Sequence, residues 1–563
     1  MTKIYGIDLG TTTTSIAHVD EYGKPQIIPN SDNERITPSV VYIENSQNIV
    51  VGTGAEVAAA TDPGREVRFV KCQMHNKEWS FELDGVHYKP ETISAEILKR
   101  VTNDASQSGE HQVHDVVITV PAYFGDLERQ RTRDAGELAG LNVVQILDEP
   151  VAAAIYYGKQ TAAMGKNVLV FDLGGGTFDV TVVKIGGDSD CEISVVCTDG
   201  DHQLGGKDFD DRIIQHLVEE FLNETGSNED ILSNPDTAYS LRKEAEINKK
   251  LLTRKKRVSI AFQHEGTKCK VSLSREKFDE LTADLLERAI VLTDGVIATA
   301  EQRGIAKIDT FLLVGGSTRM PQVKEKLIAK YGLTYNNPSL PGDTLVEFDV
   351  DEAVAKGAAI AGEIHVITRR LEIEVKKIAE EQGIDSETAV PEEREKLLEL
   401  AAQEVAVQGG YTIEEVRNVP KLRAVATKSY GIRALDVNKQ PLIFNLIAKN
   451  TRVPCRQSRI FATDQENAEG LDLVVYLDNE SSTTTPLESG AVLGEAEFQL
   501  DGNLPEGAPI EITFELDAQG ALTMNGLDQT HGRTITASFQ SDGVMTTDEK
   551  ERLKSELTMQ NVS

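Results

Sequence analysis

The sequence predicts a multidomain chain with a large two-lobed α/β region, a short α-helical insert and a C-terminal β-sandwich. Its 563 residues exceed the size of one hydrophobic core, and the usual size of domains suggests three or four units. Short apolar runs alternate with helical stretches up to about residue 362, which is typical of α/β domains. Beyond about residue 426, strand-like runs such as residues 471–476 and 510–516 are separated by turn residues, as in a β-sandwich.

These patterns divide the chain into four segments. We expect an α/β domain, a helical insert, a β-sandwich and a short helical tail at residues 1–365, 366–425, 426–545 and 546–563, respectively. The insert is rich in Glu, Lys, Ala and Leu, with one candidate helix beginning near Leu371 and another around Leu397. Pro391 suits the first turn of the second helix, and the two glutamates after it suit the positive end of the helix dipole.

The composition narrows the range of partners and compartments. A hydrophobic content of 40% and a charged content of 26% are those of an ordinary globular protein. The net charge of -33 argues against a nucleic-acid partner, because a phosphate backbone would be repelled. Five scattered cysteines without C-x-x-C spacing indicate a reducing compartment and neither a disulfide framework nor a zinc site. No apolar run approaches the roughly 18 residues of a membrane span, so we expect no membrane partner and a cytoplasmic location.

Two glycine turns of the same design suggest a duplicated unit with a cleft between the copies. Asp8 leads the first turn, at residues 7–12, and Asp172 leads the second, at residues 168–179. Glycines let the backbone approach a phosphate closely, and threonine hydroxyls add hydrogen bonds. An aspartate at each strand end can hold magnesium through water. The residues that we expect to surround the phosphates are Gly10, Thr11, Thr12, Gly174, Gly175, Gly176 and Thr177.

A third strand ends in glycines at residues 311–321. Gly315 and Gly316 follow an apolar run, which is a natural place for a nucleoside to lie against the backbone, although such strand-to-helix turns are also common without function. Residues 200–207 approach a Walker loop, but their spacing is wrong and Asp208 replaces the required Ser or Thr. The absence of H-E-x-x-H and G-x-S-x-G leaves metalloprotease and serine-hydrolase chemistry without support.

Together these motifs resemble the heat-shock protein 70 (DnaK-type) chaperone family, within the actin and sugar-kinase superfamily. Further stretches agree, at residues 117–124, 129–130, 134–136, 139–141, 148–154, 204–206, 208–210 and 351–354. The similarity runs in order through about 360 residues and resumes, more loosely, at residues 446–451, 453–454, 493–494 and 500–502. The resemblance implies an actin-like two-lobed ATPase domain followed by a peptide-binding β-sandwich.

The resemblance also assigns roles around the phosphates. Asp8 and Asp172 would hold magnesium and potassium ions, and Lys71 falls where the family keeps its catalytic lysine. Glu149 and Asp179 match its other catalytic acids, and we group Thr177 with them. Such a set suits phosphoryl transfer, which depends mostly on positioning and charge compensation. Without the resemblance, Lys71 would be interpreted as a solvated surface lysine and Glu149 as an acidic residue at the start of a helix.

Other residues match the adenosine site and the relay between domains. The helix at residues 241–250 would bind ATP or ADP through Glu246, Lys249 and Lys250, although by itself it is an ordinary charged helix face. The remaining residues that we expect around the base are Gly315, Gly316, Ser317, Arg319 and Asp351. Pro121 and Arg129 match residues that relay the nucleotide state between domains.

Some departures of the sequence from the family bear on coupling and peptide binding. The short leucine-rich linker is missing after Gly362, and the charged helical stretch that replaces it ends at residues 422–425, which places ordinary allosteric coupling in question. The chain ends at Ser563, where the family would continue into a helical lid. The peptide cleft would be acidic and favour basic segments, unless a register slip of one residue leaves Asp464 and Asp472 solvated. The peptide-binding residues that we expect are Ile432, Leu435, Asp464, Leu471 and Leu473.

We therefore expect an ATPase that acts as a chaperone in protein folding and the stress response. Its partners would be unfolded or extended polypeptides, with a J-domain co-chaperone and a nucleotide exchange factor. The alternative is a nucleotide-regulated adaptor for one dedicated partner without general folding activity. A sugar kinase of the same superfamily would have no use for the β-rich third domain.

Overall fold

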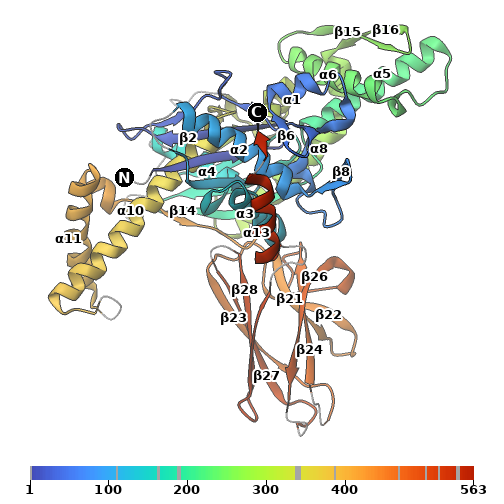
Figure 1. The fold of residues 1–563 in the computed structure, drawn as a ribbon. Helices are drawn as coiled ribbons and strands as arrows, with labels where there is room; N and C mark the ends of the chain where they lie inside the picture. Colours follow the sequence, from blue (N-terminus) through green and yellow to red (C-terminus); the bar gives the residue numbers. More distant parts are fainter. Residues whose placement is uncertain are drawn as a thin grey trace.

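The structure is a computed structural model, and Figure 1 shows two α/β lobes, a projecting helical hairpin and a β-rich domain below them. It describes residues 3–108, 112–161, 165–186, 192–335, 344–385, 389–466, 470–500, 504–517, 520–539, 545–558 and 560–562. Cys191 and the residues after Leu500 in the family-like stretch 500–502 lie outside this set. Among the described residues, no helix has the length and apolar character needed to cross a membrane.

The two lobes are built around sheets with matching strand order. In the first, the order β11-β10-β1-β2-β3 joins Asn142–Asp148, Asp115–Val120, Ile4–Leu9, Thr13–Val19 and Pro25–Ile27. In the second, the order β18-β19-β17-β12-β13-β14-β20 joins Thr334–Tyr335, Thr344–Glu347, Thr310–Val314, Asn167–Leu173, Phe178–Ile185, Glu192–Asp201 and Lys421–Arg423. The hairpins β1–β2 and β12–β13 are antiparallel, and each first strand pairs in parallel with β10 or β17. The duplication predicted from the two Asp-led turns is therefore confirmed.

The central strands β12 and β17 of the second lobe are almost entirely buried because helices cover both faces of the sheet. Every residue of β17 is buried, and so are the last six residues of β12. The helices α4 (Glu149–Thr161) and α10 (Ala353–Gln382) pack tightly, since a Cβ on Gly357 would lie 1.8 Å from the carbonyl oxygen of Ala152. This close approach requires glycine at position 357.

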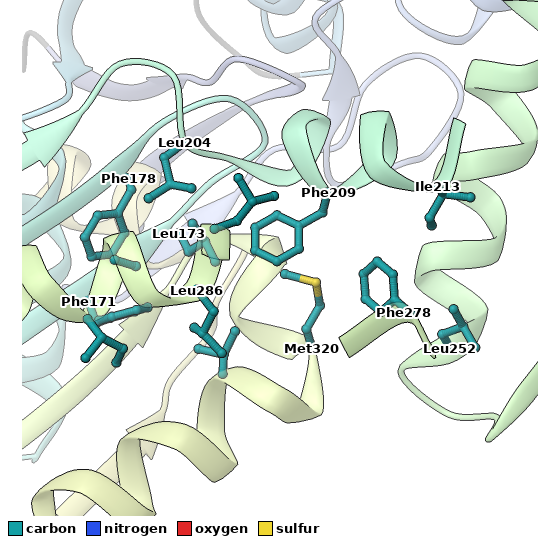
Figure 2. Close-up of a cluster of buried hydrophobic side chains, with 14 of the residues drawn as sticks. Phe171, Leu173, Phe178, Leu204, Phe209, Ile213, Leu252, Phe278, Leu286 and Met320 are labelled. Atoms are coloured by element: carbon teal, nitrogen blue, oxygen red, sulfur yellow. The ribbon is translucent and has the colours of Figure 1, made fainter. Parts of the chain in front are cut away.

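The largest core cluster lies in the second lobe and includes the aromatic side chains shown in Figure 2. Phe171 and Phe178, from the two strands of the hairpin, meet edge to face with ring centroids 4.8 Å apart. Phe209 from α5 (Gly206–Thr225) and Met320 extend the cluster toward α7 (Arg275–Leu281). Burial of such aromatic side chains contributes about 3–5 kcal/mol each when measured by truncation to alanine. This core supports the two strands that lead into and out of the second glycine turn.

The helical insert differs in its beginning from the sequence prediction. The candidate helix near Leu371 is the continuation of α10, which runs without a break through residue 366. The second helix, α11 (Pro391–Gly409), has Pro391 in its first turn, as predicted. Residues of α11 pack back along α10, the early ones near Ile378 and the later ones near Ile367, so the two helices are antiparallel. After α12 (Ile413–Arg417), the chain returns to the second lobe as strand β20.

The C-terminal region contains two antiparallel sheets that share one hydrophobic cluster. One sheet, β25-β22-β21-β24-β26, joins Thr484–Thr485, Pro441–Ile447, Ser429–Leu435, Gly470–Asp478 and Gly490–Gln499. The other, β23-β27-β28-β29, joins Cys455–Ala462, Pro509–Leu516, Leu522–Asp528 and Thr534–Phe539. The tail forms α13 (Thr547–Thr558) and β30 (Asn561–Val562), and β30 pairs in parallel with β6 (Asn48–Val51) of the first lobe.

Candidate active site

The two glycine turns face one another across the lobes and approach very closely. A Cβ on Gly175 would lie 2.2 Å from the Thr12 side chain, and one on Gly176 would lie 2.5 Å from that of Thr11. Only glycine leaves room here, so both turns present backbone N–H groups and threonine hydroxyls to the same space. The first turn of α5 joins them, because the Gly206 N–H donates to the Gly174 carbonyl at 2.9 Å. The result is a glycine-lined cradle edged by threonine side chains, which suits phosphate.

A buried lysine lies among carboxylates at the base of this cradle. Lys71, in the short helix η2 (Val70–Gln73), forms an ion pair with Glu149, the first residue of α4. Burial opposes the charge of the lysine, but Glu149 and Asp8 outweigh it, so the pKa of Lys71 is raised. The two residues lie 78 positions apart in the chain, and the fold alone brings them together.

Several carboxyl groups surround this one lysine, and their pKa values are raised. Desolvation, with help from Glu149, raises the pKa of Asp8 to about 7 and the pKa values of Asp172 and Asp179 well above their usual range. Asp172 and Asp179 are directly opposite in the β12–β13 pair. One carboxylate oxygen of Asp179 is buried and makes no hydrogen bond to any described residue. Hard oxygen ligands with a surplus of negative charge fit a magnesium ion that keeps part of its water shell, and Asp8 and Asp172 would hold it.

The expected adenosine residues come from two elements of the second lobe. Lys249, on α6 (Pro235–Leu252), donates to the Gly206 carbonyl at 2.6 Å and to Asp210 at 2.7 Å. It therefore ties α6 to the first turn of α5. On the same helix, Lys250 pairs with Glu246 at 2.7 Å.

The residues that follow strand β17 also contact the second glycine turn. Ser317 donates to the Gly174 carbonyl at 2.8 Å, so this segment touches the phosphate cradle. Gly315 has a φ of 80°, and a Cβ there would lie 2.4 Å from an oxygen of Asp172, so only glycine fits. Gly316 follows it at the start of a short helix, and Arg319 in that helix forms two hydrogen bonds of 2.6 Å with Asp351.

The predicted relay residues connect the site to the C-terminal sheets. The Arg129 guanidinium donates to Asp148 at 2.6 Å and to the Phe124 carbonyl at 2.8 Å, and Asp148 directly precedes Glu149. Pro121 begins the same loop, accepting a hydrogen bond at its carbonyl from the Phe124 N–H at 3.1 Å. At the other end of this loop, the Thr427 hydroxyl donates to the Phe124 carbonyl at 3.3 Å.

Comparison with known families gives a decisive match. The family model described as Hsp70 protein matches residues 4–380 and 398–562. The chain belongs to the Hsp70 family. The match includes both lobes and the two C-terminal sheets, and the residues between its two parts, 381–397, cover the turn of the helical hairpin. The resemblance found in the sequence motifs is thus confirmed.

Within this Hsp70 chain, the expected peptide-binding residues separate into two groups. Ile432 and Leu473 are buried in the core shared by the two sheets, and Leu471 packs against that core. Leu435 and Asp464 are exposed, the first at the end of β21 and the second in the loop after β23. Asp472 is also exposed and lies opposite Glu497 in the β24–β26 pair. The acidic residues therefore lie on the surface, and the apolar ones largely stabilise the domain.

Several residues of the Hsp70 site were missed by sequence reasoning. A Cβ on Gly205 would lie 2.4 Å from the Gly176 backbone, and the Gly205 N–H donates to Asp208 at 2.8 Å as part of a helix-capping arrangement. Two glycines followed three residues on by an aspartate are a helix-start signal that could have found them. Arg68 of the first lobe lies 4.0 Å from Glu246 of the second, a contact without a local sequence signal.

Proposed function

We propose that this Hsp70 protein hydrolyses ATP to ADP and phosphate and that hydrolysis controls its hold on extended polypeptides. The observation that carries the proposal is the continuous path of contacts from the Lys71–Glu149 ion pair, through Asp148 and Arg129, to the C-terminal sheets. A nucleotide site that served only to bind would have no need of such a path. J-domain and nucleotide exchange partners would act on this same cycle.

The side chains support a division of labour in phosphoryl transfer. A magnesium ion held through water by Asp8 and Asp172 would offset the charge of the phosphates. Lys71 is positioned by Glu149 to orient the attacking water and to stabilise the charge that develops on the transferred phosphoryl group. Asp179, one oxygen of which makes no hydrogen bond to any described residue, would in its ionised form suit a group that accepts a proton from that water. Thr177 and the glycine turns hold the phosphates in line.

Strand β20 supports the proposal that coupling survives without the usual linker. Leu422 lies opposite Ile193 where β20 extends the sheet of the second lobe beside β14, and Val425 bridges to Arg452 two residues before the cis-proline loop. The end of the helical insert thus contacts both the ATPase domain and the C-terminal sheets. We infer that it transmits the signal that the family linker transmits elsewhere.

Nucleotide-dependent peptide binding tests the proposal. The full chain is mixed with fluorescent extended peptides of basic, neutral and acidic composition, and anisotropy is followed with ATP, with ADP and without nucleotide. We expect peptide affinity to change at least tenfold between ATP and ADP, and peptides to raise the rate of single-turnover hydrolysis. A chain that binds ATP but ignores all three peptides would instead be the dedicated adaptor, and a chain that binds neither nucleotide would overturn both functions.

A further inference from the structure

A cluster of potential metal ligands lies in the outer part of the second lobe, away from the glycine turns. His264 ends β15 (Arg257–His264), and Glu265 begins the tight turn into β16 (Thr267–Ser274). Glu229 comes from the loop between α5 and the short helix η3 (Ile231–Ser233). One nitrogen of His264 and one carboxylate oxygen of each glutamate all lie within 4.8 Å of one another. Figure 1 shows β15 and β16 at the upper edge of this lobe, beside α5 and α6.

The imidazole of His264 is held in one orientation. Its side chain is 4% exposed, and its Nδ1 lies 2.9 Å from the Thr237 hydroxyl. Thr237 is itself fixed in the first turn of α6, because its N–H donates to the Asn234 side chain at 3.0 Å. The ring of Phe221 meets the imidazole edge to face with centroids 5.7 Å apart. A histidine whose Nδ1 is engaged in this way presents Nε2 to a ligand.

The Nε2 atom of His264 is the unexplained feature. It is buried, and it makes no hydrogen bond to any residue that the structure describes. A buried polar atom without a partner is destabilising, so such atoms call for an explanation. The nearest carboxylate oxygen, from Glu229, lies 3.6 Å away, which is too long for a hydrogen bond.

That separation fits two ligands of one metal ion. Zinc binds histidine nitrogen and carboxylate oxygen at roughly 2.0–2.2 Å in tetrahedral geometry, which places neighbouring ligand atoms about 3.3–3.6 Å apart. Imidazole with carboxylates is a ligand set that zinc accepts, whereas magnesium and calcium prefer oxygen alone. The two glutamates are exposed and reach the buried nitrogen from the solvent side. An ion can therefore enter without rearrangement of the core.

We propose that Glu229, His264 and Glu265 bind a divalent zinc-like metal ion, with water completing the coordination. Such an ion would join the loop after α5 to the β15–β16 hairpin, two segments about 35 residues apart in the chain. It would stabilise the outer part of the second lobe in the folded state, because binding to the folded chain alone adds to its stability. This site is independent of the nucleotide cleft and of the proposed function.

Zinc titration of the chelator-treated full chain tests the site. Three titrations are compared: zinc alone, zinc in competition with a chromophoric chelator, and zinc with millimolar magnesium present. The magnesium occupies the carboxylates of the cleft. We expect one zinc equivalent whose affinity falls at least tenfold in the Glu229→Gln/Glu265→Gln double variant and in His264→Gln. The control, Glu219→Gln, removes one exposed carboxylate of α5 outside the cluster and should bind zinc as the parent does.

A second readout separates ligand loss from unfolding. The ring resonances of His264 should shift on zinc addition in the parent and stay unchanged in the double glutamate variant, whose substitutions are both on the surface. If His264→Gln fails to fold, the double variant decides the matter. Equal zinc affinity in the parent and the double variant, or no zinc binding in the parent, would overturn the proposal.

Discussion

The phenol of Tyr430, in the first strand of the C-terminal sheets, donates a hydrogen bond of 3.0 Å to Asp126, the first residue of α3 (Asp126–Leu138). The two residues lie 304 positions apart, and Tyr430 is buried. Desolvation raises the pKa of Asp126 to about 7, while Tyr430 and Arg129 act against the increase. Arg129, which acts electrostatically on Asp126, also donates to Asp148, so the Tyr430–Asp126 contact is a second place, beside Thr427 and Phe124, where the β-rich domain meets the path to Lys71.

Loss of this contact should uncouple the domains. Tyr430→Phe keeps the ring but leaves Asp126 without its donor, which costs about 1–3 kcal/mol at the junction. We expect ATP binding to stay within about twofold of the parent and stimulation of ATP hydrolysis by peptide to fall at least fivefold. The control is Tyr22→Phe, a tyrosine that is 77% exposed. Unchanged peptide stimulation in Tyr430→Phe would show that the signal takes another route.

The raised pKa of Asp126 predicts that docking of the domains depends on pH. A carboxyl whose folded-state pKa is above its unfolded value binds a proton more tightly when docked. Its stabilising contribution is fully present below the unfolded pKa near 4 and is lost as pH rises through about 7. Small-angle scattering should therefore show a more compact chain at pH 6 than at pH 8. Asp126→Asn, which cannot titrate, should remove most of this difference, and an unaltered pH dependence in that variant would assign it to other groups.

Substitution of Lys71 should separate binding from chemistry. Lys71→Ala removes charge stabilisation in the transition state, so hydrolysis should fall below detection while ATP affinity stays within about tenfold. Removing one partner of a buried ion pair leaves Glu149 uncompensated, and the free energy of unfolding should fall by about 3–5 kcal/mol. Single-turnover kinetics, calorimetry and thermal unfolding measure the three effects. Lys24→Ala, at an exposed lysine, is the control, and hydrolysis at the parent rate by Lys71→Ala would refute the assigned role.

Strand β20 offers a test of the insert as a coupling element. Leu422→Pro removes a backbone donor and breaks the pairing of β20 with β14. We expect basal ATP hydrolysis to persist and its response to peptide to be lost. Lys421→Ala, at the exposed neighbouring position, should leave both unchanged. If Leu422→Pro responds to peptide like the parent, the insert serves a purpose other than coupling.

The residues of the candidate nucleotide site can be named from the sequence because their signals are local. Asp8 with Gly10, and Asp172 with Gly174, fall within single turns whose backbone conformation and phosphate chemistry require those residue types. The alternation of apolar runs with helical stretches likewise predicted the α/β class, since the periodicity of each element shows which face it buries. Pro391 predicted the start of α11 because proline is favoured in the first turn of a helix, which is also a local signal.

What only the tertiary structure decided are the contacts between distant segments. The Lys71–Glu149 pair, the Tyr430–Asp126 bond and the approach of Glu229 to His264 each join residues without any shared local pattern. The continuation of α10 past residue 366 and the return of β20 to the second lobe also escaped prediction. A sequence pattern specifies which surface of an element is apolar, but not which of several apolar surfaces it meets. That choice depends on packing across the whole chain, where small differences in buried area and hydrogen bonding select one arrangement.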